Sequence, residues 1–118
     1  MNVLLVGQGY VGLPVSMAAV SAGFHVTGFD TDPAKTDLLT GGGSHVEDIP
    51  SATVRAALDS GRYRVVSDAA ELNGFDVAVI TVPTPLTDGI PDLGAVEAAA
   101  AMVGGLLRTG GLVVPEST

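Results

Sequence analysis

The stretch VLLVGQGYVGLPVSMAAVSAGFHVTGFD, residues 3–30, decides the fold of this chain. A short apolar run is followed by three closely spaced glycines, Gly7, Gly9 and Gly12, and then by small apolar residues. A second apolar run ends on an acid, Asp30. Short apolar runs bounded by glycines predict buried strands, and the segment between them has the length of a helix. The stretch therefore predicts a strand, a glycine-rich turn, a helix and a second strand.

The same alternation of strand and helix patterns continues along the chain. Asp32 and Asp92 are expected to cap the helices that follow them. Strands that alternate with helices predict right-handed crossovers and a doubly wound parallel α/β sheet of about five strands, ordered 3-2-1-4-5, which is a Rossmann-type fold. The expected strands are Asn2–Val6, His25–Phe29, Tyr63–Val66, Asp76–Val82 and Leu112–Val114. The expected helices are Val11–Ala22, Pro33–Thr40, Ser51–Leu58 and Leu93–Leu107, with a helical turn at Asp68–Leu72, a proline-rich loop at Pro83–Pro91 and a turn at Gly110-Gly111.

The composition supports one packed domain and disfavours several classes of function. The 118 residues are 47% hydrophobic with a mean hydropathy of +0.46, which is ample for one core. A formal net charge of −8 disfavours nucleic-acid binding, because few cations are available to displace counterions from a phosphate backbone. The absence of cysteine excludes disulfides, thiolate metal sites and a cysteine nucleophile in this chain. No apolar run reaches membrane-spanning length, so we expect a cytoplasmic protein with no membrane partner.

The glycine turn predicts a dinucleotide-binding site. Gly7 permits the tight passage from strand to helix, Gly9 lets a pyrophosphate approach the backbone, and Gly12 lets the helix pack closely on the sheet. The unpaired amides of Tyr10 and Val11, at the positive end of the helix dipole, would hold the phosphates. An acidic chain could thus bind a dianion without basic side chains.

Asp30 predicts which dinucleotide is bound. A carboxylate at the end of the second strand, 18 residues after Gly12, suits hydrogen bonds from the adenosine ribose hydroxyls. Its charge would repel a 2′-phosphate and no arginine follows it, which favours NAD over NADP. Lys35 could reach the same ribose or be a solvated surface charge. His25 and His45 lack clustered partners and are interpreted as structural or loop residues, so no metal site is expected.

Four short motifs resemble those of the UDP-glucose/GDP-mannose dehydrogenase family. They are GQGYVGLP at 7–14, GFD at 28–30, VPTPL at 82–86 and EST at 116–118. The resemblance spans essentially the whole chain and implies that residues 1–118 are the NAD-binding N-terminal Rossmann domain of such an enzyme. Members of this family oxidise the C6 alcohol of a nucleotide sugar to a carboxylate, using two NAD and an enzyme-bound thioester.

By position, the resemblance also implies where the cofactor lies. Tyr10 and Val11 resemble the residues at the pyrophosphate, and Asp30 and Lys35 resemble those at the adenosine ribose. Thr84 resembles the threonine beside the cofactor at the point where the strand order reverses. The whole cofactor-binding set expected is Gly7, Gln8, Gly9, Tyr10, Val11, Gly12, Asp30, Lys35, Val82, Pro83, Thr84, Ser117 and Thr118.

The same resemblance implies what this chain lacks. Thr118 resembles the threonine near the nicotinamide, but the family's nucleophilic cysteine, its lysine and asparagine partners and the helix that pairs subunits lie beyond the EST motif. We therefore expect a truncated domain with no catalytic residue, able to bind NAD but unable to complete the oxidation. The full-length protein is expected to be a homo-oligomer, and the isolated chain is expected to self-associate.

Three features favour the branch of the family that acts on UDP-N-acetylhexosamines. They are SHVEDI at 44–49, PDL at 91–93 after the VPTPL motif, and Glu116. We expect the NAD-binding portion of an enzyme of nucleotide-sugar metabolism and polysaccharide biosynthesis, with a UDP-sugar bound mostly by other parts. The alternatives are a UDP-glucose or GDP-mannose dehydrogenase, a related β-hydroxyacid dehydrogenase, and a non-catalytic nucleotide-binding module.

Overall fold

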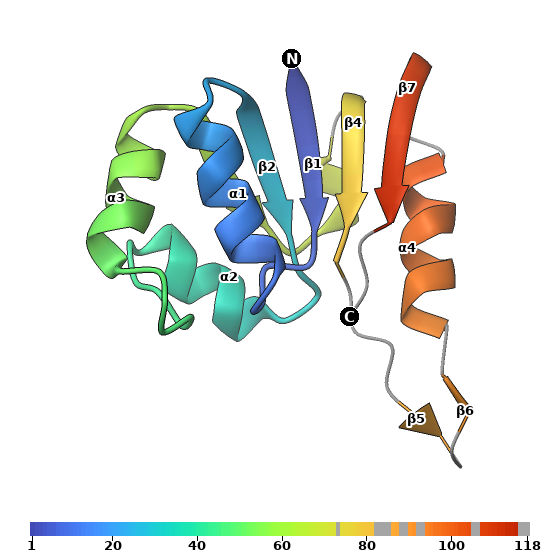
Figure 1. Cartoon of the computed structure of the whole chain (residues 1–118), viewed down its shortest axis with the longest axis horizontal. Coiled ribbons are helices and arrows are strands. Elements are labelled where there is room, and N and C mark those ends of the chain that lie inside the picture. Colours follow the sequence, from blue (N-terminus) through green and yellow to red (C-terminus); the bar gives the residue numbers. More distant parts are fainter. Residues whose placement is uncertain (73, 82–85, 88–89, 92–93, 105–106, 116–118) are drawn as a thin grey trace.

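A parallel sheet of five strands forms the centre of the molecule (Figure 1). The computed structural model describes residues 1–72, 74–81, 86–87, 90–91, 94–104 and 107–115. Neighbouring strands follow the order β3-β2-β1-β4-β7, and each neighbouring pair is parallel. The expected doubly wound order is therefore confirmed. The strands are β1 (Asn2–Val6), β2 (His25–Phe29), β3 (Tyr63–Val66), β4 (Phe75–Ile80) and β7 (Leu107–Pro115).

Helices cover both faces of the sheet (Figure 1). Helices α1, α2 and α3 contribute side chains to one buried cluster, whereas α4 contributes to the other. These elements confirm the predicted helices, with small shifts at most of their ends. The helices are α1 (Gly12–Ser21), α2 (Pro33–Thr40), α3 (Ser51–Asp59) and α4 (Gly94–Gly104), and a 3₁₀ turn, η1, spans Ala69–Glu71.

The two core clusters explain the continuous apolar run of β1. Val3 and Leu5 belong to the cluster beneath α1, while Leu4 and Val6 belong to the cluster that includes Val103 of α4. Alternate residues of a strand point to opposite faces, and here both faces are buried. Each such side chain contributes about 1.5–3 kcal/mol by its removal from water.

The last helix ends earlier than its pattern predicts. The expected helix at 93–107 stops at Gly104, and β7 already begins at Leu107. Glycine has a low helix propensity, because the folded backbone must give up the conformational freedom that a missing Cβ allows. Leu107, the last residue of the expected helix, therefore belongs to a strand.

The expected turn at Gly110-Gly111 is wrong, because β7 runs through both glycines. The strand expected at 112–114 is the second half of β7. The register of β7 on β4 shifts between Phe75 and Val77, so extra residues of β7 are accommodated at this point as an irregularity in the ladder. Glycine pairs in strands are typical of such bulges.

The proline-rich loop expected at 83–91 contains two short strands. They are β5 (Leu86–Thr87) and β6 (Ile90–Pro91), which pair antiparallel as a separate small sheet. This pair projects away from the main sheet (Figure 1). The expected cap Asp92 lies outside the described residues.

The topology creates a crevice at the carboxyl ends of β1 and β4. The two strands are neighbours, but the chain leads from β1 to α1 on one face and from β4 towards α4 on the other. The main chains of β1 and β4 remain hydrogen-bonded to each other as far as the ends of the strands, where the Thr81 amide donates to the Val6 carbonyl at 2.8 Å. In doubly wound folds this is where ligands bind.

Candidate functional site

The glycine turn between β1 and α1 requires glycine at two of its three positions. Gly7 has a φ of +95°, in the left-handed region, and a Cβ there would lie 2.9 Å from Thr81 Oγ1. A Cβ on Gly12 would lie 1.7 Å from the carbonyl oxygen of Gly7. The predicted structural roles of both glycines therefore agree with the geometry of the turn.

Gly9 faces open space. A Cβ on Gly9 would meet only the Lys35 Nζ, at 3.8 Å, so the fold itself leaves room for a side chain. Within the described part of the chain, the amides of Gly9, Tyr10 and Val11 make no hydrogen bond. Unpaired amides before the first turn of a helix form an anion-binding site, because their N–H groups and the helix dipole both favour negative charge.

The side chain of Gln8 points into the protein and not into the site. It is fully buried, and its Oε1 accepts from the Tyr63 hydroxyl at 2.6 Å and from the Ser16 Oγ at 3.2 Å. Its Nε2 donates to the carbonyls of Gly7, at 2.9 Å, and Leu5, at 3.3 Å. If Gln8 contacts the cofactor as predicted, it can do so only through its main chain, because its side chain is buried. Burial raises the pKa of the Tyr63 phenol above its ordinary value.

The glycine of the GFD motif is explained by Gln8. A Cβ on Gly28 would lie 2.5 Å from Gln8 Oε1, so the Gln8 amide occupies the space above this position of β2. Gly28 pairs with Leu5 of β1 in the sheet, directly below the turn. The two motifs, although far apart in the sequence, therefore form one interlocked unit.

Asp30 is oriented by two backbone amides, one in the glycine turn and one at the start of α2. Its Oδ2 accepts from the Gln8 amide at 2.9 Å, and its Oδ1 accepts from the Asp32 amide at 3.0 Å. The Nζ of Lys35 lies 3.9 Å from Oδ2. A carboxylate has about four lone-pair sites, so this geometry leaves acceptors for a ligand. The structure thus brings Asp30 and Lys35 together beside the glycine turn.

A cavity of about 430 Å³ opens next to these residues. One side is polar and is formed by Asp30, Asp32 and Lys35, from the end of β2 and the start of α2. The other side is apolar and includes Ala99 and Met102 of α4. This arrangement suits a nucleoside, whose sugar is polar and whose base is a flat apolar surface.

Two residues of the site were not predicted from the sequence. The Thr81 hydroxyl donates to the carbonyls of Val6, at 3.0 Å, and Gly7, at 3.1 Å, so it fastens the turn to the end of β4. Its signal is its place directly before the VPTP motif. His45, interpreted as a loop residue, lies with its Nε2 2.6 Å from the Gln8 carbonyl oxygen. No local sequence pattern predicts this contact, because it forms only when the loop after α2 folds back onto the glycine turn.

The other predicted residues are placed only in part. Tyr10 is 79% exposed at the mouth of the turn, and Val11 is half-buried beside it. Five further members of the predicted set lie outside the described residues, and they are Val82, Pro83, Thr84, Ser117 and Thr118.

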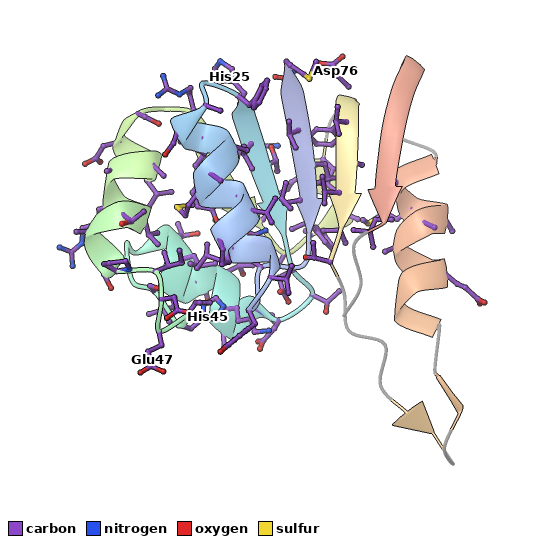
Figure 2. All side chains as sticks on the ribbon, viewed as in Figure 1. His25, His45, Glu47 and Asp76 are labelled. Carbon is purple, nitrogen blue, oxygen red and sulfur yellow. The ribbon has the colours of Figure 1, made fainter. Side chains whose placement is uncertain are left out.

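The two histidines lie far apart (Figure 2). His45 is near the start of α1, whereas His25 and Asp76 lie at the opposite end of the strands. Among the residues that the structure describes, no group of three or more His, Cys, Asp or Glu side chains could hold a metal ion. In the same part of the chain, no helix combines the length and the apolar character needed to cross a bilayer.

Comparison with known proteins relates the whole chain to nucleotide-sugar dehydrogenases. The model of the UDP-glucose/GDP-mannose dehydrogenase family, NAD binding domain, matches residues 1–118. A UDP-N-acetyl-D-mannosamine dehydrogenase from Pyrococcus horikoshii is 32% identical over 119 residues, covering 100% of this chain and 28% of the relative. An NDP-N-acetyl-D-galactosaminuronic acid dehydrogenase from Ralstonia nicotianae is 37% identical over 119 residues, covering 99% of this chain and 27% of the relative.

The fold is shared with solved members of this group. A UDP-D-ManNAc dehydrogenase structure from Pyrococcus horikoshii matches with a TM-score of 0.94 at 32% identity, covering 100% of this chain and 28% of that one. The chain thus spans 27–28% of the length of the curated relatives described above. NAD is the cofactor of the domain that these matches identify. Because the family model matches the chain from end to end, this protein belongs to the UDP-glucose/GDP-mannose dehydrogenase family and corresponds to its NAD binding domain.

Proposed function

We propose that the chain is the NAD-binding portion of a 6-dehydrogenase that oxidises the C6 alcohol of a UDP-N-acetylhexosamine to a carboxylate. The observation that carries the proposal is the group of three amides, at Gly9, Tyr10 and Val11, that find no partner among the described residues and lie beside the oriented carboxylate of Asp30. The names of the relatives from Pyrococcus horikoshii and Ralstonia nicotianae support a nucleotide-linked N-acetylhexosamine as substrate. The remaining proposals are a cytoplasmic location, a role in polysaccharide biosynthesis and a homo-oligomeric full-length protein.

The described residues fit NAD in two places. The amides of Gly9, Tyr10 and Val11 would hold the pyrophosphate, and the missing side chain of Gly9 would let it approach the backbone. Asp30 and Lys35 would hold the adenosine ribose, at the polar side of the cavity. When bound, NAD supplies the hydride acceptor for an alcohol oxidation. The protein groups named here bind and orient the cofactor.

The proposed division of labour leaves the covalent chemistry to other parts of the enzyme. The 118 residues contain no cysteine, so they offer no thiol for the thioester that the family resemblance implies. We propose that residues 1–118 are one domain of a larger enzyme, whose UDP-sugar-binding and catalytic parts lie outside them. The chain alone is expected to produce no uronate from NAD and a UDP-N-acetylhexosamine.

Calorimetric titration with NAD and NADP tests the proposed site. Asp30→Ala is expected to weaken NAD binding by roughly tenfold or more, since a hydrogen bond to a charged group contributes about 1.5–3 kcal/mol. It should also narrow the preference for NAD over NADP, because the negative charge that repels a 2′-phosphate is removed. Asp59→Ala is the matched control, since it removes the same charge from an exposed position at the end of α3. Equal NAD affinities for all three proteins would refute the site.

A further inference from the structure

We propose that His45 is a positioning residue of the pyrophosphate site, which holds the Gln8–Gly9 peptide so that the Gly9 amide faces the cofactor. The inference rests on the proposed function, because it assumes that the glycine turn binds the pyrophosphate of NAD. It concerns a residue outside the glycine turn and the GFD motif.

The first step is the hydrogen bond between His45 and Gln8. Nε2 of the ring lies 2.6 Å from the Gln8 carbonyl oxygen. A carbonyl oxygen can only accept, so Nε2 carries the proton and donates. The other ring nitrogen, Nδ1, is buried and makes no hydrogen bond within the described ranges. The ring therefore acts on the turn through Nε2.

The second step follows from peptide geometry. No peptide bond in the described structure is cis, so the carbonyl of Gln8 and the amide N–H of Gly9 point in opposite directions across one rigid plane. A hydrogen bond that fixes the carbonyl of Gln8 therefore also fixes the direction of the Gly9 donor. This matters because Gly9 has no Cβ, and glycine restricts the rotation of its flanking peptides less than any other residue.

The third step is that His45 holds the one main-chain group of Gln8 that other contacts leave free to turn. The Gln8 amide donates to Asp30, and its side chain is bonded to Tyr63 and Ser16. None of these contacts restrains the peptide plane on the carbonyl side of Gln8. In the described part of the chain, the carbonyl oxygen is bonded only by His45.

The fourth step is that His45 itself is held in place. Its neighbour Val46 is 5% exposed and belongs to the core cluster beneath α1. On its other side, the Ser44 amide donates to Ser51 Oγ of α3 at 3.1 Å, and the Ser44 hydroxyl donates to the Val46 carbonyl at 3.0 Å. Glu47, by contrast, is exposed and points away from the turn (Figure 2). The segment thus holds the His45 ring against the turn through contacts within the protein.

The experiment compares ligands that differ in the pyrophosphate. NAD, ADP-ribose and adenosine are titrated into the 118-residue chain, and binding is followed by ¹H–¹⁵N NMR, which also reports the Gly9 amide. His45→Phe keeps an aromatic ring but loses the donor, whereas His45→Gln keeps a side-chain N–H. His25→Phe, at the opposite end of the strands, is the matched control.

His45→Phe is expected to weaken NAD and ADP-ribose by about tenfold, which corresponds to about 1.4 kcal/mol, and to leave adenosine unchanged. His45→Gln should restore part of the loss, and His25→Phe should match the wild type. The Gly9 amide signal should move in His45→Phe before ligand is added. Should His45→Phe fail to fold, His45→Ala is titrated in its place with the same expectation.

The inference is overturned if the donor-less variant binds NAD as the wild type does, or if it weakens adenosine as much as NAD. Failure of the proposed function is a separate outcome. In that case the wild-type chain itself binds no NAD, or Asp30→Ala binds it with wild-type affinity. If Asp30→Ala loses NAD while His45→Phe does not, the site stands and only the role of His45 is wrong.

Discussion

Gly9 and Gly12 lack a side chain for different reasons, although they lie three positions apart in one turn. At Gly12 the neighbouring atom is the backbone oxygen of Gly7, which cannot move away without breaking the turn. At Gly9 the nearest atom is the end of the flexible Lys35 side chain. The structure therefore separates Gly12, which the fold needs, from Gly9, where a Cβ would fit and where we propose that the pyrophosphate lies.

Gly9→Val is expected to fold with nearly the stability of the wild type but to lose most of its affinity for NAD. Gly9 does not have a positive φ, so a side chain there avoids the strain of the left-handed region, and it would occupy the space proposed for the pyrophosphate. Gly12→Ala, with a far smaller side chain, should be strongly destabilised. Urea denaturation and NAD titration of both variants measure the two effects. A Gly9→Val protein that binds NAD normally would show that the phosphates lie elsewhere.

The buried phenol of Tyr63 predicts a loss of stability at alkaline pH. Its pKa is raised in the folded state, so its contribution to stability is complete below the ordinary tyrosine pKa, near pH 10, and is lost as the pH rises above it. The free energy of unfolding should fall there by about 1.4 kcal/mol per pH unit from this group. Tyr63→Phe should be less stable at neutral pH by about 1 kcal/mol and should show a shallower alkaline slope.

The wild type and Tyr63→Phe are compared by urea denaturation at several pH values between 7 and 11. A substitution of a second tyrosine serves as the control. Tyr10→Phe serves, because Tyr10 is 79% exposed and donates to no protein group in the described structure. It should keep the alkaline slope of the wild type. Equal slopes for Tyr63→Phe and the wild type would contradict the assignment.

Single residues also show where sequence patterns stop being informative. The structural roles of Gly7 and Gly12 and the position of Asp30 directly after β2 could be predicted, because they follow from local geometry and from the end of a strand. His45 and Thr81 could not, because each reaches the turn through the folding of a distant segment. Gln8 was only half predicted, since a pattern reveals its position in the turn but not that its side chain points inward.

At the scale of elements, α2 is a short helix whose N-terminus is capped by a side chain. It has 8 residues, and its N-terminus is closed by Asp32, whose Oδ1 accepts from the Ala34 amide at 3.0 Å. The Asp32 amide in turn donates to Asp30, so the start of α2 and the proposed ribose site share one set of hydrogen bonds. Lys35 follows within the first turn and reaches back to Asp30.

Asp32→Ala is therefore expected to lower the free energy of unfolding by about 1 kcal/mol, through loss of the helix cap. Asp32→Asn should keep most of the stability, because its side-chain oxygen can accept the same bond. Thermal and urea denaturation of the two variants measure this difference. Equal stabilities for Asp32→Ala and Asp32→Asn would mean that the cap contributes nothing.

Elements with strong apolar patterns were predictable in kind and nearly in extent. The five strands and four helices of the main domain all appear, in the predicted order. One error precedes α4, where the expected loop contains β5 and β6. The other errors follow Gly104, where Gly110 and Gly111 look like a turn but belong to β7. Glycine marks both turns and bulges, and only the pairing of β7 with β4 distinguishes them.

For the whole molecule, the open sheet leaves two edges. The outer strands are β3 and β7, and each has main-chain groups on its outer side that no strand of the described sheet pairs. Such edges are templates for pairing with another copy. We expect the 118-residue chain to self-associate as its concentration rises, as measured by sedimentation velocity over a dilution series. A single monomeric species at every concentration would contradict this expectation.

The close fit between Gln8 and Gly28 restricts how this protein can diverge. A methyl group at position 28 has no space while the glutamine amide lies above it, but it would have space above a shorter residue. Substitutions at positions 8 and 28 should therefore be coupled during evolution. A smaller residue at position 8 should arise before, or together with, a larger one at position 28. Homologues that keep a glutamine at position 8 should also keep a glycine at position 28.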